Sequence, residues 1–337
     1  MSNVTESAAV AAAAKAGDES AFSSLVEKYR RELHVHCYRM LGSFQDAEDM
    51  LQETFLRAWS KRSSFEGRST FRAWLYSIAT NACLDALESR ERRPTPVDAS
   101  APESGADLNA GEIPWLQPYP DRLLDASDSQ PDAAIVAKET IELAFLVAIQ
   151  LLPPRQRAVL ILRDVLGWPA KETALLLETS VASANSALQR ARATIKKHLP
   201  ARRSEWAPVA EPSEEERTLL RRYIEASEQG DADAFLEIMG ADARFSMPPE
   251  PGVYVGPKTI VDGWKQGGFG TEEFGAMRCL LTWANRQPAV ACYLRRRGES
   301  EYRPFAIDVL RIEDGLIAEI ITFPLTNPAS FDLPPAI

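Results

Sequence analysis

The chain has few of the residues that build metal centres and disulfide frameworks. It contains four cysteines and three histidines in 337 residues, and no two cysteines stand in CxxC spacing. His34 and Cys37 are three residues apart, so they can share a helix face with a metal. We favour a buried free thiol at Cys37 instead, because free cysteine behaves as a small hydrophobe. We therefore expect no metal and no cofactor.

Long apolar runs are also missing. No stretch of eighteen or more apolar residues occurs, which predicts no membrane span. The alanine-rich residues 8–14 are too short and too weakly apolar for a signal peptide, and no basic segment precedes them. We expect a cytoplasmic chain, which its length divides into two or three domains.

An excess of cations is confined to one block. The net charge of −10 argues against a general nucleic-acid coat protein. Residues 136–203, however, hold eleven cationic and five anionic side chains, whereas acidic segments stand on both sides. If the chain binds nucleic acid, this block is where we expect the phosphate contacts.

The cationic block has the pattern of a helix-turn-helix. Pro169 stands where a first helix can begin, and Ala174, Leu175 and Leu177 give that helix an apolar side. Thr179 and Ser180 form the turn, and Ser180 can cap a second helix that begins at Val181. Apolar residues then recur at spacings of three and four and form one buried stripe: Val181, Ala184, Leu188, Ala191, Ile195 and Leu199.

The other face of the second helix is polar. Short hydrogen-bonding groups at its start, followed by cations, suit base readout followed by phosphate contact. A solvated amphipathic helix without a ligand is the alternative. The candidate DNA-binding residues are Ser183, Asn185, Ser186, Gln189, Arg190, Arg192 and Lys196.

Residues 15–93 predict a second helical block. Three amphipathic stretches cover residues 21–38, 44–59 and 70–92, and Pro94 and Pro96 end the last one. The segments at residues 43–59 (SFQDAEDMLQETFLRAW) and 65–85 (FEGRSTFRAWLYSIATNACLD) closely resemble region two of extracytoplasmic-function sigma factors. The helix-turn-helix resembles region four of the same family.

This resemblance implies a promoter-specificity subunit of bacterial RNA polymerase. It implies that the first module binds core polymerase, at the clamp of the beta-prime subunit, and that the second meets the beta flap. The polymerase-binding residues that it implies lie on one acidic helix face: Asp46, Asp49, Gln52 and Glu53. Solvation and complementation of the helix dipole are the other explanation of these carboxylates.

Opening a promoter requires the capture of unpaired bases by aromatic faces, hydrogen-bonding groups and cations. By resemblance, the loop that begins at Phe65 takes a flipped base of the proximal (−10) element, and Asn81 borders that pocket. Trp74 lies on the inward stripe, so we expect it in the core. The candidate residues for the proximal element are Phe65, Arg68, Ser69, Arg72, Asn81 and Arg90, and the helix-turn-helix reads the upstream (−35) element.

Residues 94–135 predict a flexible linker rich in Pro, Gly, Ser and Asp. Residues 113–124 (IPWLQPYPDRLL) carry too many large apolar groups for a spacer alone. We expect them to dock on a surface of this chain or of the polymerase, with a local turn cluster as the alternative.

The tail predicts an α+β domain over residues 213–330. Two helices, 214–229 and 231–239, precede antiparallel strands at 242–247, 279–284, 289–297, 302–312 and 316–323, with a helix near 258–264. Residues 313–316 (EDGL) predict a hairpin. The tail resembles the SnoaL-like, NTF2-like cone domains, and the whole chain resembles sigma factors of the G type. The expected fold is therefore multidomain: an all-α helical bundle (15–93), a linker, an all-α helix-turn-helix (136–200) and the α+β cone.

The tail offers little for catalysis, since it contains no histidine to pair with an acid. Asp308 alternates with Ala306 and Leu310, so it can point into the cone as a base, a ligand contact or a structural acid. Tyr254, Trp264, Phe245 and Trp283 can line a pocket or fill a core. We expect no catalytic residue, and a tail that regulates, with an anti-sigma protein or a small ligand as its partner.

Two other functions fit part of the pattern. A helix-turn-helix regulator acts without polymerase, but it does not need the acidic helix and the Phe65 loop. A fused small-molecule isomerase or cyclase is disfavoured by the missing histidine.

Overall fold

The computed structural model describes residues 17–65, 70–91, 110, 113–125, 141–198 and 212–337. The chain forms two compact units. The first contains residues 1–107, 130–140 and 148–199, and the second contains residues 108–129, 141–147 and 200–337. Each unit is described by itself.

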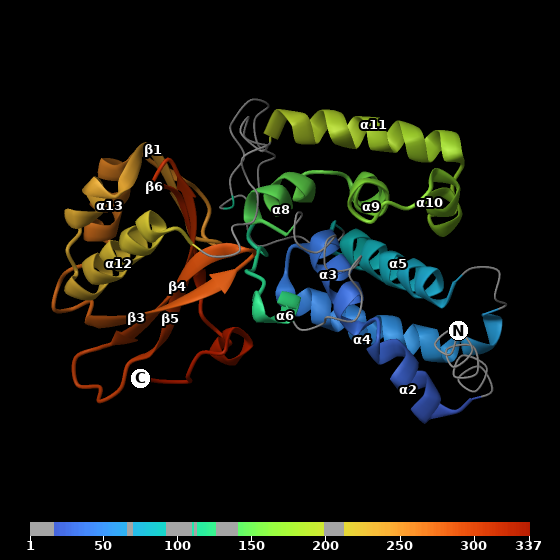
Figure 1. The fold of residues 1–337 in the computed structure, drawn as a ribbon, viewed down its shortest axis with the longest axis horizontal. Coiled ribbons are helices and arrows are strands. Elements are labelled where there is room, and N and C mark those ends of the chain that lie inside the picture. The colour runs from blue at the N-terminus through green and yellow to red at the C-terminus, as the bar shows by residue number, and fades with distance from the viewer. Residues whose placement is uncertain (1–16, 66–69, 92–109, 111–112, 126–140, 199–211) are drawn as a thin grey trace. The chain divides into compact units, whose positions relative to one another are not determined.

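The first unit is helical, as the sequence predicts (Figure 1). Its first part consists of α2 (Glu19–Glu27), α3 (Arg30–Leu41), α4 (Phe44–Ser60), a short η1 (Arg62–Ser64) and α5 (Phe71–Glu91). Ser43 caps α4 by accepting a hydrogen bond from the backbone of Asp46. The amphipathic stretch at residues 21–38 is divided between α2 and α3, because the chain turns at Tyr29, whose ring contacts Phe71.

The second part of this unit holds the last three residues of α8 (Leu143–Gln150), then α9 (Pro154–Leu160), η3 (Ile161–Val165), α10 (Ala170–Leu176) and α11 (Val181–His198). A buried arginine, Arg157 on α9, joins the two parts. Its guanidinium donates to the backbone oxygen of Met40 on α3 and to the side-chain oxygen of Gln150. Gln150 in turn donates to the oxygen of Arg39, 3.1 Å away, so the end of α3 is held against α9 through side chains.

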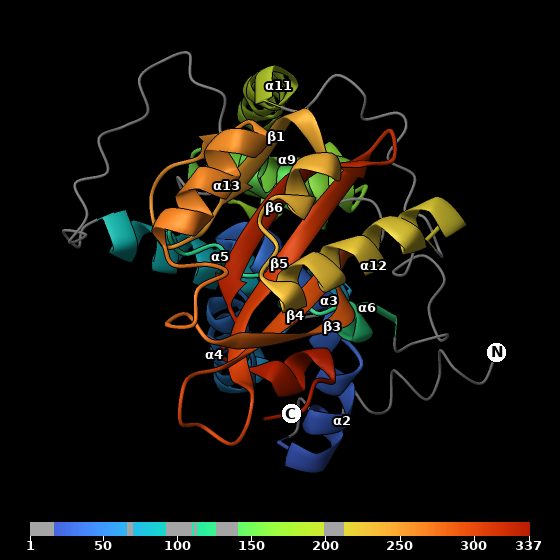
Figure 2. The same ribbon diagram turned by 90° about the vertical axis from the view of Figure 1, so that its left-hand side faces the viewer.

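The second unit is built on a six-stranded sheet with the order β2-β1-β6-β5-β4-β3. Its elements in chain order are α12 (Glu214–Gln229), η5 (Ala234–Glu237), β1 (Met239–Ser246), β2 (Tyr254–Val255), α13 (Pro257–Gln266), β3 (Ala276–Ala284), β4 (Gln287–Arg295), β5 (Arg303–Glu313), β6 (Leu316–Pro324) and η6 (Pro328–Phe331). The α+β class is confirmed. Both α12 and α13 lie on one side of the sheet (Figure 2).

Local signals explain most of these boundaries. A capping box between Ser213 and Glu216 begins α12, and Gly230 ends it in the left-handed conformation. The predicted hairpin forms with Asp314 and Gly315 at positive φ between β5 and β6.

Two expectations for the tail fail. The second helix expected over 231–239 is only the short η5, because Met239 already begins β1. The strands are also not all antiparallel, since β1 pairs with β6 in parallel. That pairing joins the first and last long strands of the domain, and a long crossover between them permits the parallel direction.

The docking expected for residues 113–124 is observed, and it occurs within the second unit. Pro120 forms an isolated bridge with Ala284, and the amide of Tyr119 donates to the side-chain oxygen of Asn285 over 2.7 Å. Ile113, Leu116 and Tyr119 are buried. We call residues 113–125, which end in α6 (Arg122–Asp125), the docked segment.

Candidate functional site

The acidic face of α4 is only partly free. Asp49 and Gln52 are exposed. Asp46 is half-buried and forms an ion pair with Arg90 of α5. Glu53 is paired with Arg57 at 2.6 Å.

An apolar side chain extends this outward face. Leu56, one helical turn beyond Gln52, is 64% exposed. Leu56 is not among the residues predicted from the sequence, although its helical spacing from Asp49 and Gln52 indicates the same face. The outward face of α4, defined here as Asp49, Gln52 and Leu56, is therefore both acidic and apolar.

An aromatic cluster stands at the start of α5. The Phe65 ring lies 5.5 Å from that of Phe71 and 5.3 Å from that of Trp74. All three side chains are half-buried, so the expectation that Trp74 lies in the core is wrong. Trp74 instead supports Phe65 at the surface. Arg68 and Ser69 lie outside the described residues.

Other candidates for the proximal element lie along α5. Two nitrogens of Arg72, Nε and Nη2, donate to Oε2 of Glu32 at 2.8 and 2.6 Å, and the guanidinium lies over the ring of Tyr76. Burial raises the pKa of the Tyr76 phenol, so this ring stays neutral. Asn81 is half-buried further along the helix. Arg72 is thus held in place by its own module.

The second helix of the helix-turn-helix, α11, begins as expected. Ser180 accepts a hydrogen bond from the amide of Ser183 over 3.1 Å. Four members of the predicted stripe are buried: Ala184, Leu188, Ala191 and Ile195. Val181 is 42% exposed instead, and Leu199 lies outside the described residues.

The polar face of α11 is exposed along its length. All seven of its candidate residues are exposed: Ser183, Asn185, Ser186, Gln189, Arg190, Arg192 and Lys196. Arg192 differs from the others because it makes two hydrogen bonds to Asp164, at 2.8 and 2.6 Å. That contact joins Arg192 of α11 to η3.

The apolar side of α10 was assigned partly to the wrong residue. Ala174 and Leu177 are buried, but Leu175 is 75% exposed and Leu176 is buried in its place. A helix turns by about 100° per residue, and α10 uses Thr173, Ala174, Leu176 and Leu177 as its inner face.

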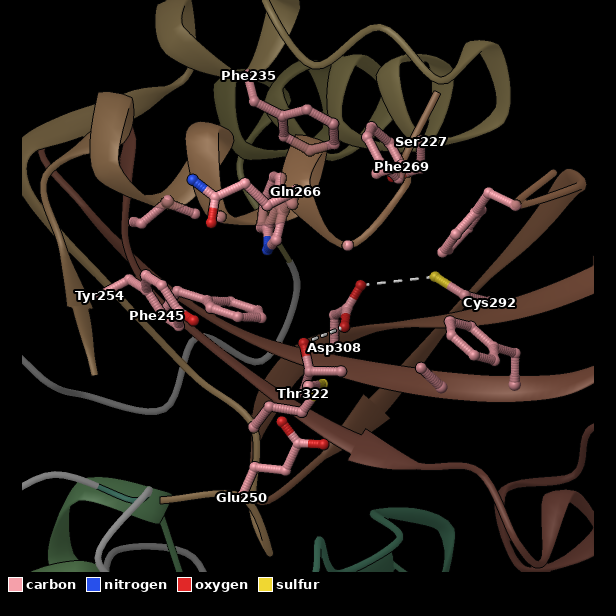
Figure 3. Close-up of a pocket in the computed structure, with 18 of the residues that line it drawn as sticks. Ser227, Phe235, Phe245, Glu250, Tyr254, Gln266, Phe269, Cys292, Asp308 and Thr322 are labelled. Carbon is pink, nitrogen blue, oxygen red and sulfur yellow. Dashed lines mark hydrogen bonds between the residues drawn. The ribbon is translucent and has the colours of Figure 1, made fainter. Parts of the chain in front are cut away.

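In the tail, Asp308 points into a cavity, as expected, and is 9% exposed (Figure 3). Burial raises the pKa of its carboxyl group. Phe245, Tyr254 and Trp264 line the same cavity. Trp283 is not among its lining residues, and its backbone oxygen accepts from the amide of Asp121 in the docked segment.

The cysteines are all free and buried. Cys279 and Cys292 face each other across β3 and β4, with their sulfur atoms 3.6 Å apart. Within the described residues no group of three or more His, Cys, Asp or Glu side chains is placed to hold a metal ion. None of the helices described is long and apolar enough to cross a bilayer.

Three family models match the chain. They are sigma-70 region 2 over residues 25–93, sigma-70 region 4 over residues 142–195, and the SnoaL-like domain over residues 220–320. A solved structure, the extracytoplasmic function sigma factor SigJ of Mycobacterium tuberculosis, matches with a TM-score of 0.56 and 24% identity. The match covers 93% of this chain and 99% of that one, which supports the fold.

Curated relatives match over nearly the same length. The ECF RNA polymerase sigma factor SigG of Mycobacterium tuberculosis is 43% identical over 305 residues, which are 90% of this chain and 80% of the relative. The probable ECF RNA polymerase sigma factor SigI of the same organism is 29% identical over 304 residues, 88% of this chain and 89% of the relative. With both sigma modules and the tail matched in order, the chain belongs to the ECF RNA polymerase sigma factors.

Proposed function

We propose that this sigma factor divides its work among three surfaces. Core polymerase binds α4 at Asp46, Asp49, Gln52 and Glu53, with the second module on the beta flap. The proximal element is opened by the Phe65 cluster and the cations near it, and the upstream element is read by the polar face of α11. The domain limits that go with this division are 15–93, 136–200 and 213–330.

The observation that carries the promoter assignment is the exposed face of α11. Its seven polar side chains are exposed in the described structure, while four residues of the opposite stripe are buried. Such a helix presents donors and acceptors to base edges first and cations to phosphate afterwards.

On α4, intramolecular pairing separates the roles of the carboxylates. Arg90 and Arg57 partly neutralise Asp46 and Glu53. The Asp46–Arg90 pair joins α4 to α5, whereas the Glu53–Arg57 pair lies within α4. Asp49 remains to meet a basic surface. Leu56 adds apolar area that binding can bury.

We further propose that the tail regulates and does not catalyse. Sigma factors themselves are not enzymes, and the tail contains no histidine. Support for regulation comes from the docked segment. It belongs to the stretch of chain between the two sigma modules, and the tail holds it through Asn285 and through Arg122, which donates to the backbone oxygens of Ser330 and Ala329. The tail thereby shortens the free length of chain between the modules, which sets their effective concentration for each other.

With this function the protein would act in the cytoplasm, where core polymerase and promoter DNA are found. An anti-sigma protein is a further partner that fits the family. It would compete with polymerase for the outward face of α4.

The experiment that tests the function is promoter binding with and without core polymerase. A labelled promoter fragment is titrated with the full chain alone and with the chain plus core polymerase, at the same salt concentration in both titrations. A sigma factor gives tight, sequence-selective binding only with core polymerase. Equal, selective binding by the chain alone supports the helix-turn-helix regulator instead.

A further inference from the structure

The second unit contains a cavity of about 510 Å³ between the sheet and the helices α12 and α13. Protein interiors are packed without voids of this size. Cavities of about 300–1,000 Å³ are typical of small-molecule sites. The cavity of the second unit opens to solvent where its lining residues Met247, Glu250 and Tyr254 are exposed, so a molecule can enter there.

One wall of the cavity is a continuous row of aromatic rings. Its members come from β1, β2, α13, the segment before β3, and β5, and in order of contact they are Tyr254, Phe245, Trp264, Phe269, Phe274 and Phe305. Neighbouring centroids in this row are 5.3–6.0 Å apart. We call it the aromatic wall. Such a wall offers ring faces and edges to a flat apolar molecule.

The charges of the cavity exclude one class of ligand. Its described lining includes two acids, Asp308 and Glu250, and no Lys, Arg or His. A carboxylate or phosphate ligand would therefore enter a desolvated space without a counter-charge, which is costly. The lining therefore disfavours an anionic ligand.

Asp308 provides the polar contact. Its oxygens accept from the hydroxyl of Thr322 at 2.6 Å and from the hydroxyl of Tyr223 at 2.9 Å (the former is drawn in Figure 3). Cys292 lies 3.5 Å away as a weak third donor. An ionised carboxylate has about four acceptor positions. Thr322, Tyr223 and Cys292 all donate to Asp308, so its carboxyl group serves as an acceptor. One acceptor position of this group is left for a hydrogen-bond donor of a ligand.

We propose that this cavity binds a neutral, ring-bearing molecule with a hydroxyl group, whose rings pack on the aromatic wall and whose hydroxyl donates to Asp308. No bond is made or broken in this step. The site is independent of the tail's role in transcription, so its test does not depend on the proposed function.

The test uses equilibrium dialysis of the full chain against three probes of equal ring size. The first is 2-naphthol, which carries the hydroxyl group. Naphthalene lacks it, and 2-naphthoate replaces it with an anion. We expect saturable binding of one 2-naphthol per chain, weaker binding of naphthalene and the weakest binding of 2-naphthoate.

Two variants locate the probe. Asp308→Asn replaces one acceptor oxygen by an amide nitrogen that donates, and it should weaken 2-naphthol about tenfold or more, with little effect on naphthalene. Phe274→Ala should weaken both, because it removes a ring of the aromatic wall. Phe331→Ala is the matched control, since Phe331 is half-buried like Phe274 but is not part of the lining.

The proposal is overturned by any one of three results. The first is the absence of saturable 2-naphthol binding. The second is equal binding by Phe274→Ala and Phe331→Ala. The third is unchanged 2-naphthol affinity in a folded Asp308→Asn protein. If Asp308→Asn does not fold, the two phenylalanine variants decide the question.

Discussion

Base reading and phosphate contact are assigned to adjacent residues on α11. Gln189 and Arg190 are both exposed there, and they differ in what they can recognise. The amide of Gln189 suits adenine, whereas the guanidinium of Arg190 suits phosphate.

Gln189→Ala should therefore relax the preference at one base pair of the upstream element, with a loss of roughly 1–3 kcal/mol of discrimination. Arg190→Ala should weaken all promoters alike and reduce the dependence of affinity on salt. The measurement is binding of chain plus core polymerase to a library of upstream elements at several salt concentrations. Equal shifts by both variants across the library would show that this division of roles is wrong.

A buried histidine gives the first unit a pH dependence. His36 is fully buried, and its ring contacts the hydroxyl of Thr80 at 2.9 Å. Burial lowers its pKa to about 3, with smaller contributions from the nearby Arg39 and Arg72. In the unfolded chain the pKa returns to about 6.5. The unfolded state thus binds more protons below that pH, and stability falls as the pH drops from about 6.5.

His36→Gln should remove the part of this loss that is due to His36, while His34, whose pKa is lowered by burial to about 4, keeps its own part. At pH 5 the histidine accounts for about 2 kcal/mol, and the melting temperature of the variant should fall less between neutral pH and pH 5 than that of the native chain. Thermal unfolding followed by far-UV circular dichroism measures the difference. Parallel melting curves at both pH values would contradict the assignment.

At the scale of the element, the structure separates two kinds of carboxylate on α4. Charge reversal at Glu53 would also break its pair with Arg57, so Asp49 gives the cleaner test. Asp49→Lys should weaken core polymerase binding while changing stability by no more than about 0.5 kcal/mol.

Glu19→Lys, at an exposed position of α2, is the matched control. Fluorescence anisotropy with labelled chain and purified core polymerase gives both affinities. If Asp49→Lys binds as tightly as Glu19→Lys, the outward face of α4 is not the contact.

Most elements were predictable because their ends carry local signals. The caps at Ser43, Ser180 and Ser213 place three helices to within one residue. The Asp314–Gly315 turn likewise places the last hairpin.

The predictions of burial and of free charges that failed depend on contacts between distant residues, which a local sequence pattern does not contain. Leu175 and Val181 stand at apolar positions of a helical pattern, yet both are exposed in the part of the chain that the structure describes. The ion pairs of Asp46 with Arg90 and of Arg72 with Glu32 join residues that are forty or more positions apart in the sequence. The acidic helix was visible in the sequence, but which of its acids are neutralised was not.

At the scale of the whole molecule, the docked segment is the part of the chain between the two sigma modules that the tail binds. Asp121 accepts from the amide of Arg286, and Arg122 holds the end of the tail. The double substitution Asp121→Ala and Arg122→Ala removes two of the polar contacts of the docked segment, so it should weaken the docking and lengthen the connection on average. A longer connection lowers the effective concentration of one module for the other.

Transcription by core polymerase should then change several-fold for the double variant, with Arg303→Ala, at an exposed position of β5, as the control. An increase and a decrease in transcription both agree with regulation by the tail, because a docked segment can hold the modules apart or at a productive spacing. A folded double variant with the activity and promoter choice of the native chain would show that the tail does not regulate.

The central claim is that this chain makes core polymerase promoter-specific. It is tested most directly by run-off transcription of genomic DNA with purified core polymerase, followed by sequencing of the RNA 5′ ends. With the full chain added, we expect a set of start sites that core polymerase alone does not use and that share two upstream elements at one spacing. If the folded chain, bound to core polymerase, adds no such start sites, the account is contradicted.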